Sequence, residues 1–121
     1  MGQDNAARIP ADRLRVRADF DRVFRQGRVW RGPRLSVHIA PSREARARLG
    51  IVVSRKVGGA VTRNRFKRLL REAFRREKPL LPLPCDVVVV VRSSVDDGME
   101  PLAAELRRAF QSFPLTNNGS A

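Results

Sequence analysis

Residues 62–78 carry an apolar face and a row of cations with the spacing of one α-helix. At about 100° per residue, one arc of the helix is apolar, comprising Phe66, Leu69, Leu70, Ala73 and Phe74. The opposite arc holds Asn64, Lys67, Arg68, Arg71 and Arg75, with Arg65 and Arg76 on its flank. This pattern predicts a helix that packs one face against a core and projects cations from the other. Thr62 is expected to cap its N-terminus.

The positive charge of the chain is concentrated around this helix. Residues 28–71 contain thirteen basic residues and one acid, Glu44, within a chain whose net charge is +13. An ordinary solvated helix face is the common alternative, but such faces mix charges at i, i+4 for mutual support. Glu72 and Glu77 are the only acids between residues 45 and 85. The segregation predicts a polyanionic partner, and nucleic acid is the commonest one.

The start of the helix gives a second reason to expect phosphate binding. Arg63, Arg65 and Lys67 crowd its first turns, where the helix dipole and free backbone N–H groups already favour anions. Each cation there costs roughly a few tenths of a kcal/mol, and a bound phosphate would turn that cost into binding energy. Gly58 and Gly59, just upstream, let the backbone approach such an anion closely.

The chain has the size and composition of one globular domain. Its 121 residues are 42% hydrophobic, which is enough for a core and unlike a disordered basic tail. We expect one domain over 1–121, with an ordered core at about 13–113 and flexible ends at 1–12 and 114–121. The longest apolar run, residues 87–91, is far shorter than the ~20 residues of a membrane span. With no signal-peptide pattern and a lone Cys85, a cytoplasmic location is expected.

Hydrophobic periodicity places the other elements. Phe20, Val23 and Phe24 mark a helix over residues 18–26, with Gly27 in the position of a C-cap glycine. Strands are expected at 28–31, 35–40 and 48–54, and the last two should pair antiparallel because their connection is short. Residues 86–92 are apolar on both faces, which is typical of a central strand. A last amphipathic helix is expected over 100–113.

Three segments resemble one known family. The signature helix of the bacterial ribonuclease P protein subunit is similar to residues 63–72 (RNRFKRLLRE), and its first helix to residues 17–27 (RADFDRVFRQG). Its third strand and loop are similar to residues 49–58 (LGIVVSRKVG). The resemblance implies an α+β fold in the order αβββαβα, a two-layer α/β sandwich also found among ribosomal proteins. It further implies a four-stranded mixed sheet with a left-handed βαβ crossover, against the usual right-handed preference.

The resemblance implies that the protein assists a catalytic RNA in removing the 5′ leader from precursor tRNA. It implies two binding sites, one for each RNA. Residues expected to bind the RNA subunit are Arg55, Lys56, Arg63, Asn64, Arg65, Lys67, Arg68 and Arg71. Residues expected to bind the single-stranded leader are Arg17, Phe20, Phe24, His38, Ser54, Val88 and Val90.

The leader-binding residues have ordinary alternatives. Phe20 and Phe24 lie one turn apart, as core residues of an amphipathic helix also do, and both roles can hold at once. The family often has tyrosine where His38 stands, so stacking on a base would be weaker or pH-dependent here. From the pattern alone, His38 fits a plain strand histidine.

The sequence offers no catalytic constellation of its own. One histidine, one cysteine and the Asp96–Asp97 pair cannot assemble a nucleophile with its base or a two-metal site. Catalysis is therefore expected from the RNA subunit, with Mg²⁺ held mainly by that RNA and its substrate. The main alternative is a ribosomal-type or chaperone-like RNA-binding protein. A self-sufficient nuclease would need catalytic residues that this sequence lacks. A double-strand DNA binder would be expected to show a helix-turn-helix pattern, which is also missing.

Overall fold

The computed structural model describes the backbone of residues 13–120 and the side chains of residues 13–113. The expected order αβββαβα is confirmed, with one additional 3₁₀ turn, η1. The elements are α2 (Arg17–Gln26), β1 (Arg28–Arg31), β2 (Leu35–Pro41), β3 (Arg48–Val52), α3 (Ala60–Glu77), η1 (Lys78–Leu80), β4 (Cys85–Val91) and α4 (Met99–Ser120). The flexible arm expected at residues 1–12 lies outside the described residues. The backbone of α4 continues past the expected end at Phe113 because a helix can extend beyond its last core-facing side chain.

The four strands form one mixed sheet in the order β1-β2-β4-β3. The expected antiparallel pairing of β2 with β3 is wrong, because β4 lies between them, antiparallel to β2 and parallel to β3. Residues 87–91 are apolar on both faces and gain most burial at the centre of the sheet. The connection at 42–47 is long enough to pass over the end of one intervening strand. The predicted central position of β4 is confirmed, and the left-handed sense of the β3–α3–β4 connection stays a prediction.

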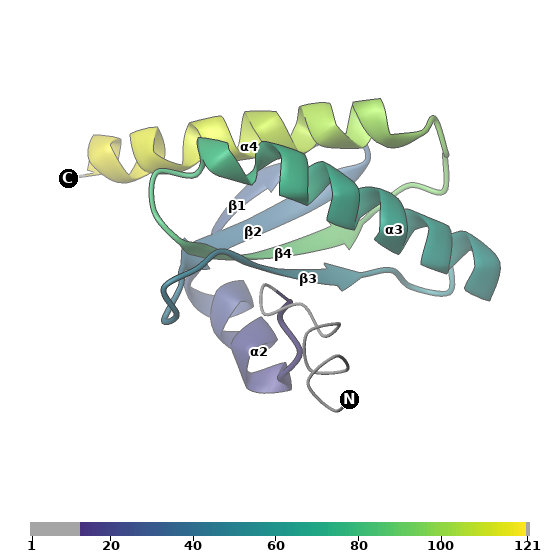
Figure 1. Ribbon diagram of the computed structural model, residues 1–121, viewed down its shortest axis with the longest axis horizontal. Helices are drawn as coiled ribbons and strands as arrows, with labels where there is room; N and C mark the ends of the chain where they lie inside the picture. Colours follow the sequence, from purple (N-terminus) through teal and green to yellow (C-terminus); the bar gives the residue numbers. More distant parts are fainter. Residues whose placement is uncertain (1–12, 121) are drawn as a thin grey trace, which may run out of the picture.

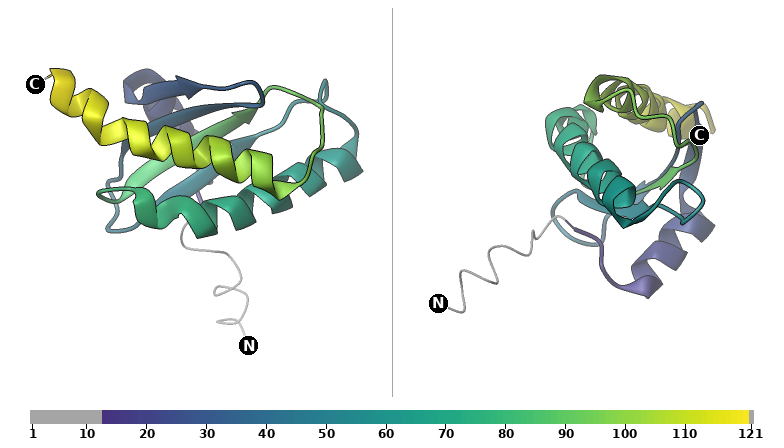
Figure 2. Two further views of the ribbon diagram at one scale, coloured as in Figure 1. Left: turned by 90° about the horizontal axis from the view of Figure 1, so that it is seen from above. Right: turned by 90° about the vertical axis from the view of Figure 1, so that its right-hand side faces the viewer.

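Helices cover the two faces of the sheet unequally. Figures 1 and 2 show α3 and α4 side by side on one face and the shorter α2 on the other. The larger core lies under α3 and α4, where Val87 and Val89 meet Phe66, Leu70 and other buried side chains. The smaller core lies under α2. Because α2 is only ten residues long, part of the second sheet face lies outside its cover.

Two expected helix caps differ from the structure. The N-cap of α3 is Gly59, with no side-chain hydrogen bond, and Thr62 lies inside the first turn, where it cannot cap. Gly27 does follow α2, but its φ of −79° is extended and not left-handed. Its small size is needed for another reason, since a Cβ there would lie 2.5 Å from the Val23 carbonyl oxygen and 3.0 Å from that of Ile39.

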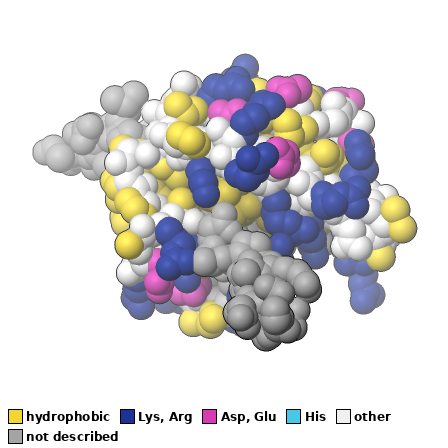
Figure 3. Space-filling model, in the orientation of Figure 1, with side chains coloured by type: hydrophobic (Ala, Val, Ile, Leu, Met, Phe, Trp, Pro, Cys, Tyr) yellow, Lys and Arg dark blue, Asp and Glu magenta, His cyan; other side chains and the backbone are white. Residues whose placement is uncertain are grey.

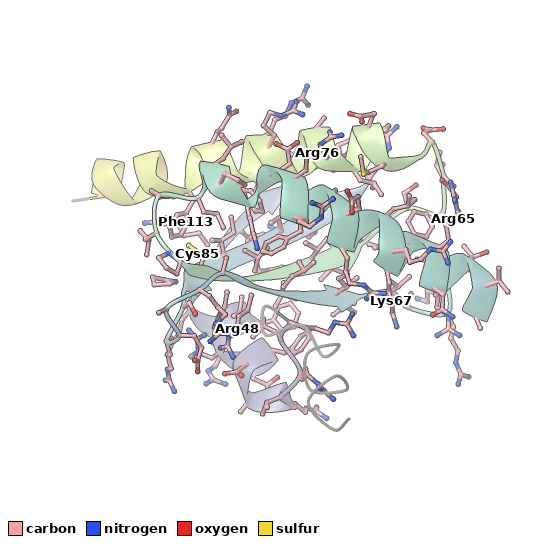
Figure 4. All side chains as sticks on the ribbon, viewed as in Figure 1. Arg48, Arg65, Lys67, Arg76, Cys85 and Phe113 are labelled. Atoms are coloured by element: carbon pink, nitrogen blue, oxygen red, sulfur yellow. The ribbon has the colours of Figure 1, made fainter. Side chains whose placement is uncertain are left out.

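A buried ion-pair network fixes α2 on the sheet. The Asp86 carboxylate, at the start of β4, is fully buried. It accepts hydrogen bonds from Arg48 of β3, whose Nε and Nη2 lie 2.9 Å from its two oxygens, and from Arg22 of α2. Arg22 also donates to the Pro41 carbonyl oxygen at 3.3 Å. The Asp86 carboxylate therefore joins α2 to β3 and β4, and Arg22 adds a bond from α2 to the end of β2. Figure 4 shows Arg48 beneath the sheet beside α2.

Candidate nucleic-acid interface

The amphipathic character predicted for α3 is confirmed, and it follows from the position of the helix over the sheet. Phe66, Leu70, Ala73 and Phe74 are at most 2% exposed, while Asn64 and Arg68 face solvent. No acidic residue lies in the first turn. The exposed side of α3 therefore presents cations with nothing on its own first turn to offset them.

The α4-facing flank of α3 is neutralised by acids from outside the helix. Arg65 forms an ion pair with Asp96, in the loop between β4 and α4. Arg76 donates to the two carboxylate oxygens of Glu100 at 2.8 and 2.9 Å. Figure 4 shows both arginines on the side of α3 toward α4 and its preceding loop. Arg65, expected to bind the RNA subunit, is thus already paired within the chain.

The opposite flank of α3, toward β3, has no such compensation. Arg63, Lys67 and Arg71 are half-buried there, and no ion pair from any of them to a carboxylate is found among the described residues. Burial, together with repulsion from Arg13 and Arg68, lowers the pKa of Arg71 below its usual range. Nε of Arg63 is buried without a hydrogen-bond partner. This flank of α3 therefore has unused capacity for an anion.

The loop that leads into α3 extends the same surface. Ser54, Arg55 and Lys56 are exposed, in a turn closed by a 3.1 Å hydrogen bond from the Val57 N–H to the Ser54 carbonyl. This turn lies next to the uncapped N-terminus of α3, whose free N–H groups and dipole favour anions. Figure 3 shows Lys and Arg side chains gathered over the N-terminal part of α3. The arrangement suits a row of phosphates.

The second expected site, for the leader, lies where α2 meets the sheet. The rings of Phe24 and His38 are edge to face, with centroids 4.8 Å apart and planes at 80°. Phe24 is 40% exposed. Burial, then the nearby Arg31 charge, lowers the pKa of His38 below its usual value, so the ring is neutral near pH 7. Nδ1 of His38 is buried without a partner. The pair therefore offers an exposed aromatic ring, Phe24, that packs against the neutral ring of His38.

The remaining leader-site residues differ in exposure. Arg17 is exposed at the start of α2 and lies 4.0 Å from Asp21. Val90 is half-buried on the α2 side of the sheet. Val88, paired with His38 across the ladder, is fully buried in the smaller core and supports the site from within. Phe20 packs against Gly50, where a Cβ would come within 2.5 Å of its ring.

One pocket joins residues that the sequence assigned to different sites. Phe20, expected at the leader site, lines it together with Lys67 and Arg71, expected at the RNA-subunit site. Arg13 lines it as well, and sequence reasoning did not single out that residue. It also missed the Arg22–Asp86–Arg48 network. An acid directly before an apolar central strand was the available signal, because a buried carboxylate requires partners.

The described residues contain neither a metal-binding cluster of His, Cys, Asp or Glu side chains nor a membrane-spanning helix. Within residues 13–113, no three His, Cys, Asp or Glu side chains gather in a way that could hold a metal ion. No helix in the described part of the chain is long and apolar enough to cross a membrane.

The chain is similar to proteins of one family. The sequence model described as Ribonuclease P matches residues 10–113. The ribonuclease P protein component of Chlamydia trachomatis serovar D is 41% identical over 108 residues, which are 88% of this chain and 89% of the relative. That of Roseiflexus sp. strain RS-1 is 42% identical over 103 residues, 84% of each protein.

Solved structures agree with the sequence relatives. The RNase P protein from Thermotoga maritima superposes with a TM-score of 0.73 at 33% identity, covering 84% of this chain and 96% of that one. The RNase P protein of Staphylococcus aureus superposes with a TM-score of 0.71 at 32% identity, covering 81% and 91%.

Proposed function

The chain belongs to the ribonuclease P protein family, and we propose that it binds two RNAs on different surfaces. In this proposal α3 and the loop before it bind the catalytic RNA of ribonuclease P. The Phe24–His38 side of α2 and the sheet holds the single-stranded 5′ leader of precursor tRNA. The protein is the RNA-binding component of an RNA-dependent endonuclease, and the RNA carries out the cleavage.

The observation that carries this proposal is the uncompensated flank and outer face of α3. Lys67, Arg68 and Arg71 have no carboxylate partner among the described residues, whereas the α4-facing arginines of the same helix do. A protein that neutralises phosphates gains affinity by releasing their counterions. Two RNAs repel each other when they meet, and cations placed between them lower that repulsion. We therefore expect the protein to increase the affinity of the RNA subunit for its substrate.

The leader site supplies a different contact. A single strand binds proteins through bases stacked on aromatic rings beside a basic groove. Phe24 and His38 provide the rings, and Arg17 lies on the same helix as Phe24. Mature tRNA has no leader, so this site would distinguish substrate from product. The ribosomal-type alternative is not favoured, because the relatives are ribonuclease P protein components.

The catalytic chemistry is proposed to lie outside this chain. Mg²⁺, held mainly by the RNA subunit and the substrate, would supply the metal chemistry of phosphodiester hydrolysis. This chain's own residues bind and orient the two RNAs. The purified protein alone should leave precursor tRNA intact, and adding a bacterial ribonuclease P RNA with Mg²⁺ should give leader removal at low salt. Cleavage by RNA-free protein would overturn the proposal.

A matched pair of variants tests the assignment of α3. Arg68 and Arg108 are both exposed arginines on the helical layer, one on α3 and one on α4. Arg68→Ala should weaken binding to the RNA subunit and reduce the salt slope of log K by about 0.7–0.9, while Arg108→Ala should change neither. Equal effects of the two substitutions would show that the interface with the RNA subunit does not lie on α3.

A further inference from the structure

The free edge of β3 borders a pocket of about 420 Å³ between α2, α3 and residues 13–14. Leu14, Phe20 and Ile51 contribute apolar walls, and Arg13, Lys67 and Arg71 contribute cations. The Leu14 N–H donates to the Leu49 carbonyl at 2.9 Å, so residues 13–14 pair with the edge of β3 only at Leu49. Its lining includes residues from both faces of the sheet, because Ile51 packs against the larger core and Phe20 against the smaller.

The charge of the pocket is one-sided. Its lining includes one acid, Glu72, which is paired with Arg75 along the helix. Arg13, Lys67 and Arg71 have no carboxylate partner among the described residues, and Arg13 and Arg71 repel each other. Like charges held together at a half-buried position are stabilised by a bound anion. The lining therefore favours an anionic ligand with an apolar, flat body.

We infer that this pocket binds one unstacked nucleotide of the RNA subunit, with its base against Phe20, Leu14 and Ile51 and its phosphate beside Arg13, Lys67 and Arg71. The inference rests on the proposed function and extends it to a specific pocket. Pockets of roughly 300–1,000 Å³ take ligands of this size class. Aromatic and apolar walls with a cationic rim are the means by which proteins hold unpaired bases.

The position of the pocket favours the RNA subunit over the leader. Among the described residues, its two α3 cations without a carboxylate partner, Lys67 and Arg71, lie beside the exposed outer face of the helix, which carries Asn64 and Arg68. The Phe24–His38 pair lies over β2, and β4 separates β2 from β3. A peptide strand added to the β3 edge would use backbone hydrogen bonds and would not need three cations. The test must therefore distinguish binding of the RNA subunit from binding of the leader or of a protein strand.

Phe20 and Phe24 form a matched pair for this test, since they lie one turn apart on α2 and only Phe20 lines the pocket. Binding is measured to the RNA subunit alone, with no precursor present. Phe20→Leu should weaken it by about 5- to 150-fold, the range expected for one lost base contact, while Phe24→Leu should leave it unchanged. Circular dichroism and thermal melting keep the comparison to folded protein.

Arg13 and Arg15 supply a second pair, two exposed arginines of which only Arg13 lines the pocket. Arg13→Ala should lower the salt slope for the RNA subunit by about 0.7–0.9, and Arg15→Ala should not. Normal binding by both Phe20→Leu and Arg13→Ala would overturn the inference. The proposed function would still stand if Arg68→Ala weakened binding, and it would fall if Arg68→Ala did not.

Cross-linking identifies the occupant directly. Cys85 is fully buried and its thiol pKa is raised to about 11, mainly by burial, so a photoreactive group can be attached selectively to Arg13→Cys. The control is Gln111→Cys on the exposed face of α4. Cross-links to one position of the RNA subunit, absent from the control, support the inference. Cross-links confined to the leader or to protein overturn it.

Discussion

Asp96 forms an ion pair with Arg65, which is one of the arginines that the sequence placed at the RNA interface. The pairing, together with the Gly98 N–H that donates to the same carboxylate, lowers the pKa of Asp96. A carboxylate in this position competes with phosphate for the Arg65 guanidinium, because both groups bind it in the same forked geometry. The loop before α4 therefore sets how much of the α3 charge is left for the proposed RNA interface.

Asp96→Asn should strengthen binding to the RNA subunit and steepen its salt dependence. Freed from its partner, Arg65 becomes available for one further phosphate contact, which would add about 0.7–0.9 to the slope of log K against log salt. The matched control is Asp97→Asn, because Asp97 pairs with Arg34 and not with α3. Filter binding between 50 and 200 mM salt measures the slope. An unchanged slope for Asp96→Asn would show that Arg65 does not reach the RNA.

Removing the charge of Asp86 should destabilise the protein severely. Asp86→Asn leaves the buried Arg22 cation without a carboxylate and leaves Arg48 with Asp19, whose Oδ2 lies 3.6 Å from Nη1 of Arg48. Removing one partner of a buried pair in this way costs about 3–5 kcal/mol. Asp21→Asn is the control, since the Arg17–Asp21 pair is exposed and such pairs are worth about 0–1 kcal/mol. Urea unfolding gives both free energies of unfolding. Similar values for the two variants would remove the anchoring role assigned to Asp86.

The elements of this fold that depend on periodicity could be predicted from the sequence. The apolar arc of α3 and the central position of β4 follow from the spacing and the two-faced apolar character of those segments. The partner of β3 could not be predicted in this way, since a short connection is compatible with pairing or with passing over another strand. Chain proximity favoured β2, but burial of both faces of β4 decided the sheet order.

The candidate site, like the fold, could be predicted from the sequence only in part. That α3 would carry cations away from the core was predictable, because one helix wheel determines it. Which cations remain unpaired depends on what packs beside the helix. Arg65 faces the Asp96 loop and Lys67 faces β3. These neighbours come from segments distant in the sequence, so no local pattern contained the information.

Phe24 should contribute to binding only when the substrate has a leader. Phe24→Leu keeps an apolar side chain in a position that is 40% exposed, so its effect on folding should be small. If a leader base packs there, holoenzyme affinity for precursor tRNA falls by the equivalent of about 1–3 kcal/mol. Affinity for mature tRNA is the internal control and should not change. Equal losses for both RNAs would assign Phe24 to the core and place the leader elsewhere.

His38 should make the stability of the protein sensitive to acid. Burial, reinforced by the Arg31 charge, lowers the pKa of His38 in the folded state, so the unfolded chain takes up a proton first as the pH falls. Histidine in the unfolded chain has a pKa of about 6.5. Above that pH His38 causes no loss of folding stability, and below it the loss grows as the pH falls. The loss stops increasing below the folded pKa, where both states are protonated.

His38→Gln removes this titration while keeping a polar side chain beside Phe24. The difference in melting temperature between wild type and variant, measured from pH 8 to pH 5, should be constant above about pH 6.5 and should shift in favour of the variant below it. The carboxylates of both proteins titrate alike and cancel in this difference. A difference in melting temperature that does not vary with pH would show that folding leaves the pKa of His38 unchanged, so that its site in the folded protein disfavours the charged ring no more than water does.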